Sequence, residues 1–265
     1  MQATLTAGFS NALGCIAVLA ISLLVGGCVS TTQGVFTDEA SPEKALDTRV
    51  TLARQYISEG NWDDAKRNLE LAKEIEPDNA EVYEAFGLLY QRTGELELAE
   101  ESFDNSVRLD RNCSRCRNNY AAFLYSQERY KEAESQLERV VKDTLYSGRP
   151  LAFVNLGLCR LKLFDPQGAE EAFVRALSMD RSNRIALLEV AQIRYEAGDM
   201  SAAIDYYTRY RSLVRKQSAA GLWLGIRLAR ETGDRDAEAS YQLALGSLYP
   251  DSPEYQAFQR IERGE

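Results

Sequence analysis

The sequence predicts an all-α protein, a right-handed superhelical solenoid of six helix pairs followed by a C-terminal capping helix. A pattern of small and bulky residues recurs about every 34 residues along most of the chain. Gly60, Gly94 and Gly198 return at one place in this pattern, where a residue in the left-handed conformation would close the first helix of a pair. A composition of 45% hydrophobic and 27% charged residues is that of a folded chain rather than a disordered one.

The N-terminal segment, residues 1–27, is expected to be a cleaved signal peptide. It carries no charged residue, and its apolar stretch, residues 12–25, is shorter than the roughly 20 residues of a transmembrane helix. The next residues, Leu24-Val25-Gly26-Gly27-Cys28, resemble a bacterial lipobox, in which cleavage precedes a cysteine that becomes lipidated. The Lys or Arg usual near the start is missing, and the alternatives are an uncleaved apolar tail or a chance occurrence of two small residues before a cysteine.

Lipidation at Cys28 would give a lasting membrane anchor, because each buried methylene of the acyl chains contributes about 0.8 kcal/mol. Val29 follows the cysteine. By resemblance to lipoproteins of Gram-negative bacteria, the lack of Asp at this place favours the periplasmic face of the outer membrane, with retention in the inner membrane left open. Residues 28–45 are expected to be a tether.

The repeat is most complete after Tyr83, where Phe86, Gly87, Tyr90 and Phe103 stand at the places of the tetratricopeptide pattern. Small residues at the eighth and twentieth places let two helices approach, and bulky residues at the fourth, seventh, eleventh and twenty-fourth places fill the gap to the next pair. The six repeats are expected at residues 46–79, 80–113, 114–149, 150–183, 184–217 and 218–251.

The last segment, residues 252–265, carries Tyr255, Phe258 and Ile261 at three-residue spacing. This spacing places the three side chains near one face of a helix. We therefore expect a capping helix that covers the end of the sixth repeat.

Partners of tetratricopeptide proteins usually lie in a concave groove lined by the first helices of the pairs. By that resemblance, the second, fifth, ninth, twelfth and thirteenth places of each repeat face the groove. These places are polar in the first three repeats and unusually apolar in the last three, which favours a slot for a partner's helix or strand. The alternative is that several of these residues are ordinary core. The expected groove residues are Asn118, Tyr125, Leu151, Val154, Leu158, Leu161, Ile185, Leu188, Tyr195, Leu222 and Ile226.

No enzymatic activity, catalytic residue, metal, cofactor or small-molecule substrate is expected. The chain has no His, which removes the commonest general base and metal ligand, and its net charge of −9 argues against nucleic acid. Cys113 and Cys116 form a CxxC motif that could belong to a redox enzyme. However, the chain lacks the βαβ context of thioredoxin-like proteins, and two cysteines cannot complete a zinc site. A local disulfide is the expectation.

The middle of the chain is more specific. The segments Asn118-Asn119-Tyr120, Phe123-Leu124-Tyr125, Asp143-Thr144-Leu145-Tyr146 and Asn155-Leu156-Gly157 closely resemble the PilF/PilW family of type IV pilus biogenesis lipoproteins, or pilotins. One departure is Ala121, where the family has a glycine, a small-for-small change.

The resemblance implies a non-enzymatic protein that binds the secretin subunit of the type IV pilus. Such proteins promote the delivery of the secretin to the outer membrane and its multimerisation there, and twitching motility depends on the resulting pore. The main rival is a tetratricopeptide lipoprotein that serves as an adaptor for peptidoglycan hydrolases or for outer-membrane protein assembly.

Overall fold

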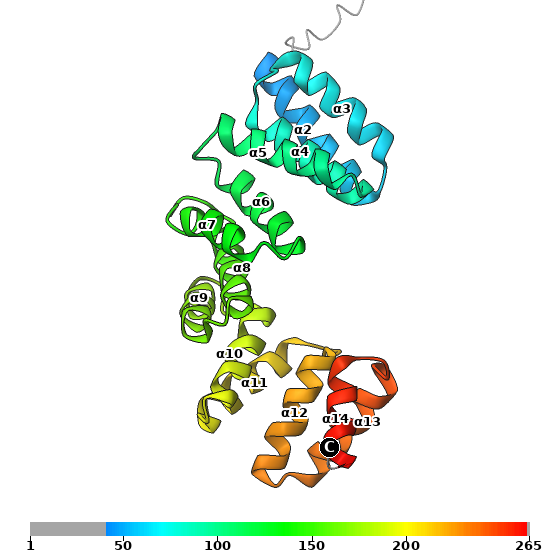
Figure 1. The fold of residues 1–265 in the computed structure, drawn as a ribbon, viewed down its shortest axis with the longest axis vertical. Coiled ribbons are helices and arrows are strands. Elements are labelled where there is room, and N and C mark those ends of the chain that lie inside the picture. The colour runs from blue at the N-terminus through cyan, green and yellow to red at the C-terminus, as the bar shows by residue number, and fades with distance from the viewer. Residues whose placement is uncertain (1–40, 264–265) are drawn as a thin grey trace, which may run out of the picture. The chain divides into compact units, whose positions relative to one another are not determined.

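The computed structural model describes residues 41–263, which are all-α. The expected signal peptide, the lipidation site Cys28 and most of the expected tether therefore lie outside the described residues. Six consecutive helix pairs are followed by one last helix (Figure 1). The pairs are α2 (Pro42–Glu59) with α3 (Trp62–Ile75), α4 (Ala80–Thr93) with α5 (Leu96–Leu109), α6 (Ser114–Ser126) with α7 (Tyr130–Val140), α8 (Arg149–Lys162) with α9 (Pro166–Met179), α10 (Arg184–Glu196) with α11 (Met200–Leu213), and α12 (Ala219–Thr232) with α13 (Arg235–Leu248), and the last helix is α14 (Pro253–Arg263).

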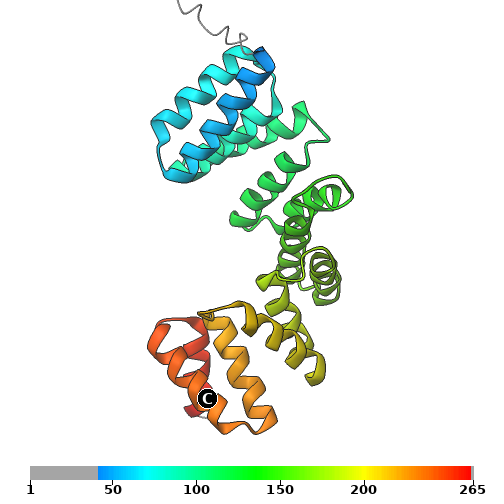
Figure 2. The ribbon, with the colours of Figure 1, turned by 180° about the vertical axis from the view of Figure 1, so that it is seen from behind.

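From α4 onward, the two helices of each pair pack against each other. First helices also contact the first helix of the next pair, as α4 does with α6, α6 with α8, and α10 with α12. Second helices pack against the following first helix, as in α7 against α8 and α9 against α10. Opposite views show the same succession of pairs (Figures 1 and 2). The predicted all-α superhelical tetratricopeptide fold is confirmed.

Short polar side chains start many of these helices. The Asn79 side chain accepts hydrogen bonds from the backbone N–H groups of Glu81 and Val82 at the start of α4. Asn183, Asp199 and Asp234 cap α10, α11 and α13 in the same way. Since the first N–H groups of a helix have no partner within the helix, each such cap contributes about 1 kcal/mol.

The turn that ends the first helix of a pair needs a residue with positive φ. Gly94 (φ 86°) and Gly233 (φ 74°) supply it at the ends of α4 and α12. At the matching turns of the third and fourth pairs, Glu128 (φ 60°) and Phe164 (φ 61°) adopt it without being glycine. A bulky side chain in this region costs roughly 1–2 kcal/mol.

Replacing Phe164 with glycine is expected to raise the free energy of unfolding by about 1 kcal/mol. The Phe164 ring is 93% exposed, so little packing is lost, whereas the strain of the left-handed backbone is relieved. Urea denaturation would measure the change. Phe164→Ala is the control, since it removes the ring and keeps the strained Cβ. If Phe164→Ala stabilised the protein as much as Phe164→Gly, the ring and not the backbone would be responsible.

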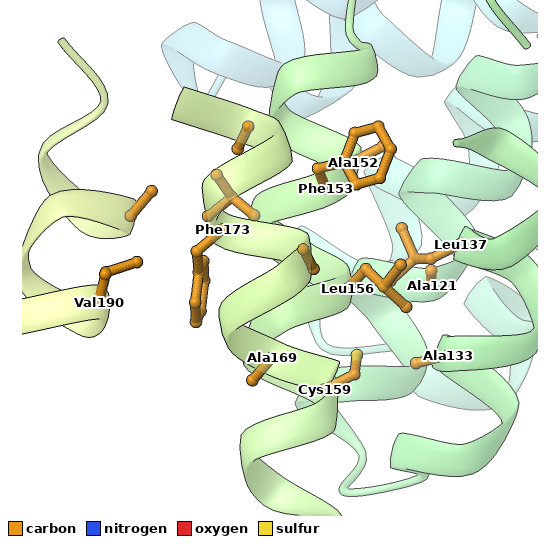
Figure 3. Close-up of a cluster of buried hydrophobic side chains, with 14 of the residues drawn as sticks. Ala121, Ala133, Leu137, Ala152, Phe153, Leu156, Cys159, Ala169, Phe173 and Val190 are labelled. Atoms are coloured by element: carbon orange, nitrogen blue, oxygen red, sulfur yellow. The ribbon is translucent and has the colours of Figure 1, made fainter. Parts of the chain in front are cut away.

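The core repeats one contact between a glycine and an aromatic ring. Phe173 of α9 is fully buried in a cluster with Leu156 of α8 and Val190 of α10 (Figure 3). A Cβ added to Gly157 would lie 2.6 Å from the Phe173 ring. Gly87 and Phe103 make the same contact in the second pair, so where the twenty-fourth place holds a phenylalanine, the two helices approach too closely for a side chain at the eighth place.

The final helix covers the sixth pair, as expected of a cap. α14 packs on α12, where the rings of Trp223 and Phe258 are 6.4 Å apart and those of Tyr255 and Phe258 6.0 Å apart. A small separate cluster of buried residues, which includes Leu222 and Ile226, lies against these rings. A terminal repeat would otherwise expose this apolar face to water.

Candidate partner-binding groove

The candidate site is the face formed by the first helices α6, α8, α10 and α12, here called the first-helix groove. Of the residues expected to line it, seven keep part of their side chains exposed. Leu151 and Ile185 are the most open, at 50% and 49% exposed. The others, Tyr125, Leu158, Leu161, Leu188 and Tyr195, are half-buried and pack against the core at their inner edges.

Four of the expected groove residues are buried and do not present their side chains on the surface of this structure. Asn118, Val154, Leu222 and Ile226 are all at most 5% exposed. Asn118, Val154 and Leu222 stand at the fifth place of their repeats, and this place lies between neighbouring first helices. Glu84, at the fifth place of the second repeat, is also buried. Ile226 lies in the cluster against which Trp223 of α12 and Tyr255 and Phe258 of the capping helix α14 pack. These residues support the groove from beneath.

A hollow of about 90 Å³ opens between α6 and α8. Ala122, Tyr125, Asn155 and Leu158 line it, with Cys159 at its wall. The volume equals that of about three water molecules, which suits one aliphatic side chain. Burial raises the pKa of the Cys159 thiol to about 12, so the thiol is neutral at physiological pH. The hollow is therefore small and uncharged, and well suited to an apolar anchor.

Asn155 adds a polar group to this hollow. Its Nδ2 donates a hydrogen bond to Oδ1 of buried Asn118 at 3.2 Å, which ties α8 to α6. Asn118 thus acts on the groove from below, by fixing the distance between two first helices, rather than as a contact for a partner.

A second hollow, of about 310 Å³, lies beside α10 and α12. The Arg227 guanidinium lies over the ring of Tyr195 at 4.7 Å and over that of Trp223 at 5.3 Å, two cation–π contacts. Burial lowers the pKa of Arg227. The pKa of Glu189 is raised, mainly by burial and to a lesser extent by the negative charge of Glu196. This end of the groove offers flat aromatic surface around one fixed cation.

Sequence reasoning missed Trp223 and Arg227, which both line this second hollow. Their spacing of four residues, which puts both side chains on the same side of a helix, was a signal that could have been read. The contact with Tyr195 on another helix could not be read from spacing.

The first three pairs present a polar network in place of apolar hollows. Glu84 of α4 is fully buried. Its carboxylate accepts a hydrogen bond from Nε of Arg54 of α2 at 3.2 Å and another from the side-chain amide of Asn119 of α6. Glu81 pairs with Arg54 at 3.5 Å and with Arg115. These side chains already bond one another across three first helices, so they have little capacity left for a partner.

Cys113 and Cys116 form a disulfide at the start of α6, with their Cα atoms 5.3 Å apart. The sulfur of Cys113 also accepts from the backbone N–H of Cys116 at 3.1 Å and so caps the helix. Cys116 is fully buried. In the part of the chain that the structure describes, no group of three or more His, Cys, Asp or Glu side chains could hold a metal ion. The arrangement supports a structural role for the cysteine pair.

The double variant Cys113→Ser/Cys116→Ser is expected to cost no more than about 2 kcal/mol of unfolding free energy, since the disulfide closes a very short loop. Serine at position 113 can also keep the helix cap. Thermal melting with and without a reducing agent would measure the change. Reducing agent should lower the melting temperature of the wild type and leave the double variant unchanged. Complete unfolding of the double variant at room temperature would contradict this expectation.

No helix within residues 41–263 is long and apolar enough to cross a membrane.

Comparisons with known proteins agree with this geometry. A tetratricopeptide repeat family model matches residues 84–150, 122–180 and 154–221. The type IV pilus assembly protein PilF of Pseudomonas aeruginosa is 38% identical over 246 residues, which covers 92% of this chain and 97% of that protein. A solved structure of Pseudomonas aeruginosa PilF matches with a TM-score of 0.79 over 83% of this chain and 99% of its own. The crystal structure of PilW, described as a widely conserved type IV pilus biogenesis factor, matches at 25% identity with a TM-score of 0.69, over 82% of this chain and 99% of its own.

Proposed function

Because this chain belongs to the PilF/PilW family of tetratricopeptide proteins of type IV pilus biogenesis, we propose that it is a pilotin. In this role it binds the secretin subunit of the type IV pilus and promotes its localisation and multimerisation in the outer membrane. The protein acts as a binding scaffold in the pilus system and not as an enzyme.

The observation that carries the proposal is the apolar hollow between α6 and α8 in the first-helix groove. An extended strand or an amphipathic helix of the secretin could place one aliphatic side chain there. Partly exposed Leu151, Leu161, Ile185 and Leu188 could provide further apolar surface for its neighbouring side chains. Because anchors buried in well-fitted pockets supply most of the binding energy at protein interfaces, this hollow is the expected centre of the contact.

Delivery to the outer membrane also needs an anchor, and this part of the proposal rests on the sequence alone. Lipidation at Cys28, after removal of residues 1–27, would hold the protein on the periplasmic face of the outer membrane. Residues 28–45 would then tether the helical pairs to the lipid.

Filling the hollow tests the proposal without disturbing the core. Ala122 is an exposed residue of α6 at the hollow, so Ala122→Phe should occupy the space from outside and leave the fold intact. We expect the affinity for the purified secretin subunit, measured by biolayer interferometry, to fall at least tenfold. The matched control is Ala239→Phe, the same change at an exposed position of α13 that does not line the hollow.

One outcome would contradict secretin binding, and a second would contradict the place assigned to the contact. If wild-type protein failed to bind the secretin subunit, the rival function as an adaptor for peptidoglycan hydrolases or outer-membrane protein assembly would gain. If Ala122→Phe and Ala239→Phe both bound as the wild type does, secretin binding would stand and the hollow would not be its centre.

A further inference from the structure

A basic pocket of about 600 Å³ lies apart from the hollows of the first-helix groove, at the loops that join the second, third and fourth pairs. Arg111 belongs to the loop before α6, Arg117 to the first turns of α6, Arg139 to the end of α7, and Lys142 to the loop after α7. Four cations thus converge in a chain whose net charge is −9. Such a concentration of one sign attracts an anion.

None of these four cations forms an ion pair within residues 41–263, whereas Arg129 and Arg160, which precede and follow α7 in the chain, each bind two glutamates. The one carboxylate of the pocket, Asp143, is engaged elsewhere. It accepts from the Ser114 hydroxyl at 2.6 Å and from the backbone N–H of Leu145 at 3.0 Å. Four cations against this one carboxylate leave the pocket lining with an excess of positive charge.

Arg117 is the fixed member of the cluster. It is only 5% exposed, and its Nε donates to the carbonyl of Arg111 at 2.9 Å while its Nη1 donates to Gln136. Burial lowers the pKa of Arg117, the like charge of Arg139 lowers it further, and the nearby Asp110 carboxylate opposes this shift without reversing it. Within the described residues its Nη2 has no hydrogen-bond acceptor. A buried cation with like charges beside it costs stability unless an anion offsets them.

We propose that this pocket binds a phosphate group, carried by a lipid headgroup or by a free phosphate. Guanidinium groups bind phosphate oxygens in a bidentate manner, and Arg117 and Arg139 provide them beside Arg111 and Lys142. Because the cations surround one hollow, they suit a compact group with more than one negative charge. An acidic protein segment would be better served by cations spread along a groove. The site is independent of secretin binding.

Charge reversal at Arg139 tests the site. Arg139 is exposed, so Arg139→Glu should fold, and losing its repulsion of Arg117 should leave the melting temperature unchanged or higher. The matched control is Arg175→Glu, the same change at the same place of the next repeat, where the arginine is exposed and does not line the pocket. Isothermal titration of the purified full-length chain would use two probes, inorganic phosphate and the soluble dihexanoyl phosphatidic acid.

The wild type and Arg175→Glu should bind phosphate saturably, and Arg139→Glu at least tenfold more weakly. Tighter binding of the phosphatidic acid would identify a lipid headgroup as the source, and equal or tighter binding of inorganic phosphate would identify free phosphate. The proposal is overturned if the wild type shows no saturable binding, if Arg175→Glu loses as much as Arg139→Glu, or if a glutamate oligomer binds the pocket more tightly than both probes. The last result would assign the pocket to an acidic protein segment.

Discussion

Replacing Phe173 with alanine is expected to lower the free energy of unfolding by about 3–5 kcal/mol, as measured by urea denaturation followed by circular dichroism. The ring is fully buried between three helices, so its removal leaves a cavity that the surrounding backbone cannot collapse to fill. In a repeat array, buried side chains also form the contacts between neighbouring pairs. Removing the Phe173 ring should therefore weaken the packing of the fourth pair against the fifth as well.

The partner of Phe173 allows a sharper test. Alanine is a better helix former than glycine by about 1 kcal/mol, yet Gly157→Ala is expected to destabilise by about 1–3 kcal/mol because the new methyl would meet the Phe173 ring. In a Phe173→Leu background the smaller side chain leaves room, and Gly157→Ala should cost much less. As a control, Gly157→Ala is combined with Leu243→Ala at an exposed site on α13. The two changes in unfolding free energy should add, because the sites do not contact each other. If Gly157→Ala alone stabilised the protein, the close approach of α8 and α9 would be refuted.

Glu84→Ala is expected to cost about 3 kcal/mol. Glu84 is fully buried, and its removal leaves Arg54 and Asn119 without their shared acceptor between α2, α4 and α6. The control is Arg54→Met/Glu84→Met, which replaces both charges with apolar groups and should be nearly neutral. Thermal and urea unfolding would measure both variants. A cost below about 1 kcal/mol for Glu84→Ala would mean that water takes over the role of the carboxylate.

The fold could be predicted because its main determinant is local. A glycine such as Gly157 and an aromatic residue such as Phe173 recur at fixed places, and each repeat needs only its neighbours to form. The candidate groove could be predicted only in part. Whether a fifth-place residue such as Val154 faces a partner or the next first helix depends on how closely those helices approach, and a linear pattern does not contain that distance.

Two further features depend on contacts between distant segments. Ile226 is buried in the cluster against which the capping helix packs, and the basic pocket draws Arg111, Arg117 and Arg139 from different parts of the chain. Nor did the sequence indicate that Phe164 takes the place of glycine at a turn, because its ring contributes nothing to the repeat pattern.

The most direct test of the proposed function is to delete the gene for this protein and to probe outer-membrane fractions for heat-resistant secretin multimers. We expect the multimers to disappear, to return when the wild-type protein is supplied, and to stay absent when Cys28→Ala is supplied. Multimers that persist unchanged in the deletion strain would contradict the assignment as a pilotin, and the first-helix groove would then serve another partner.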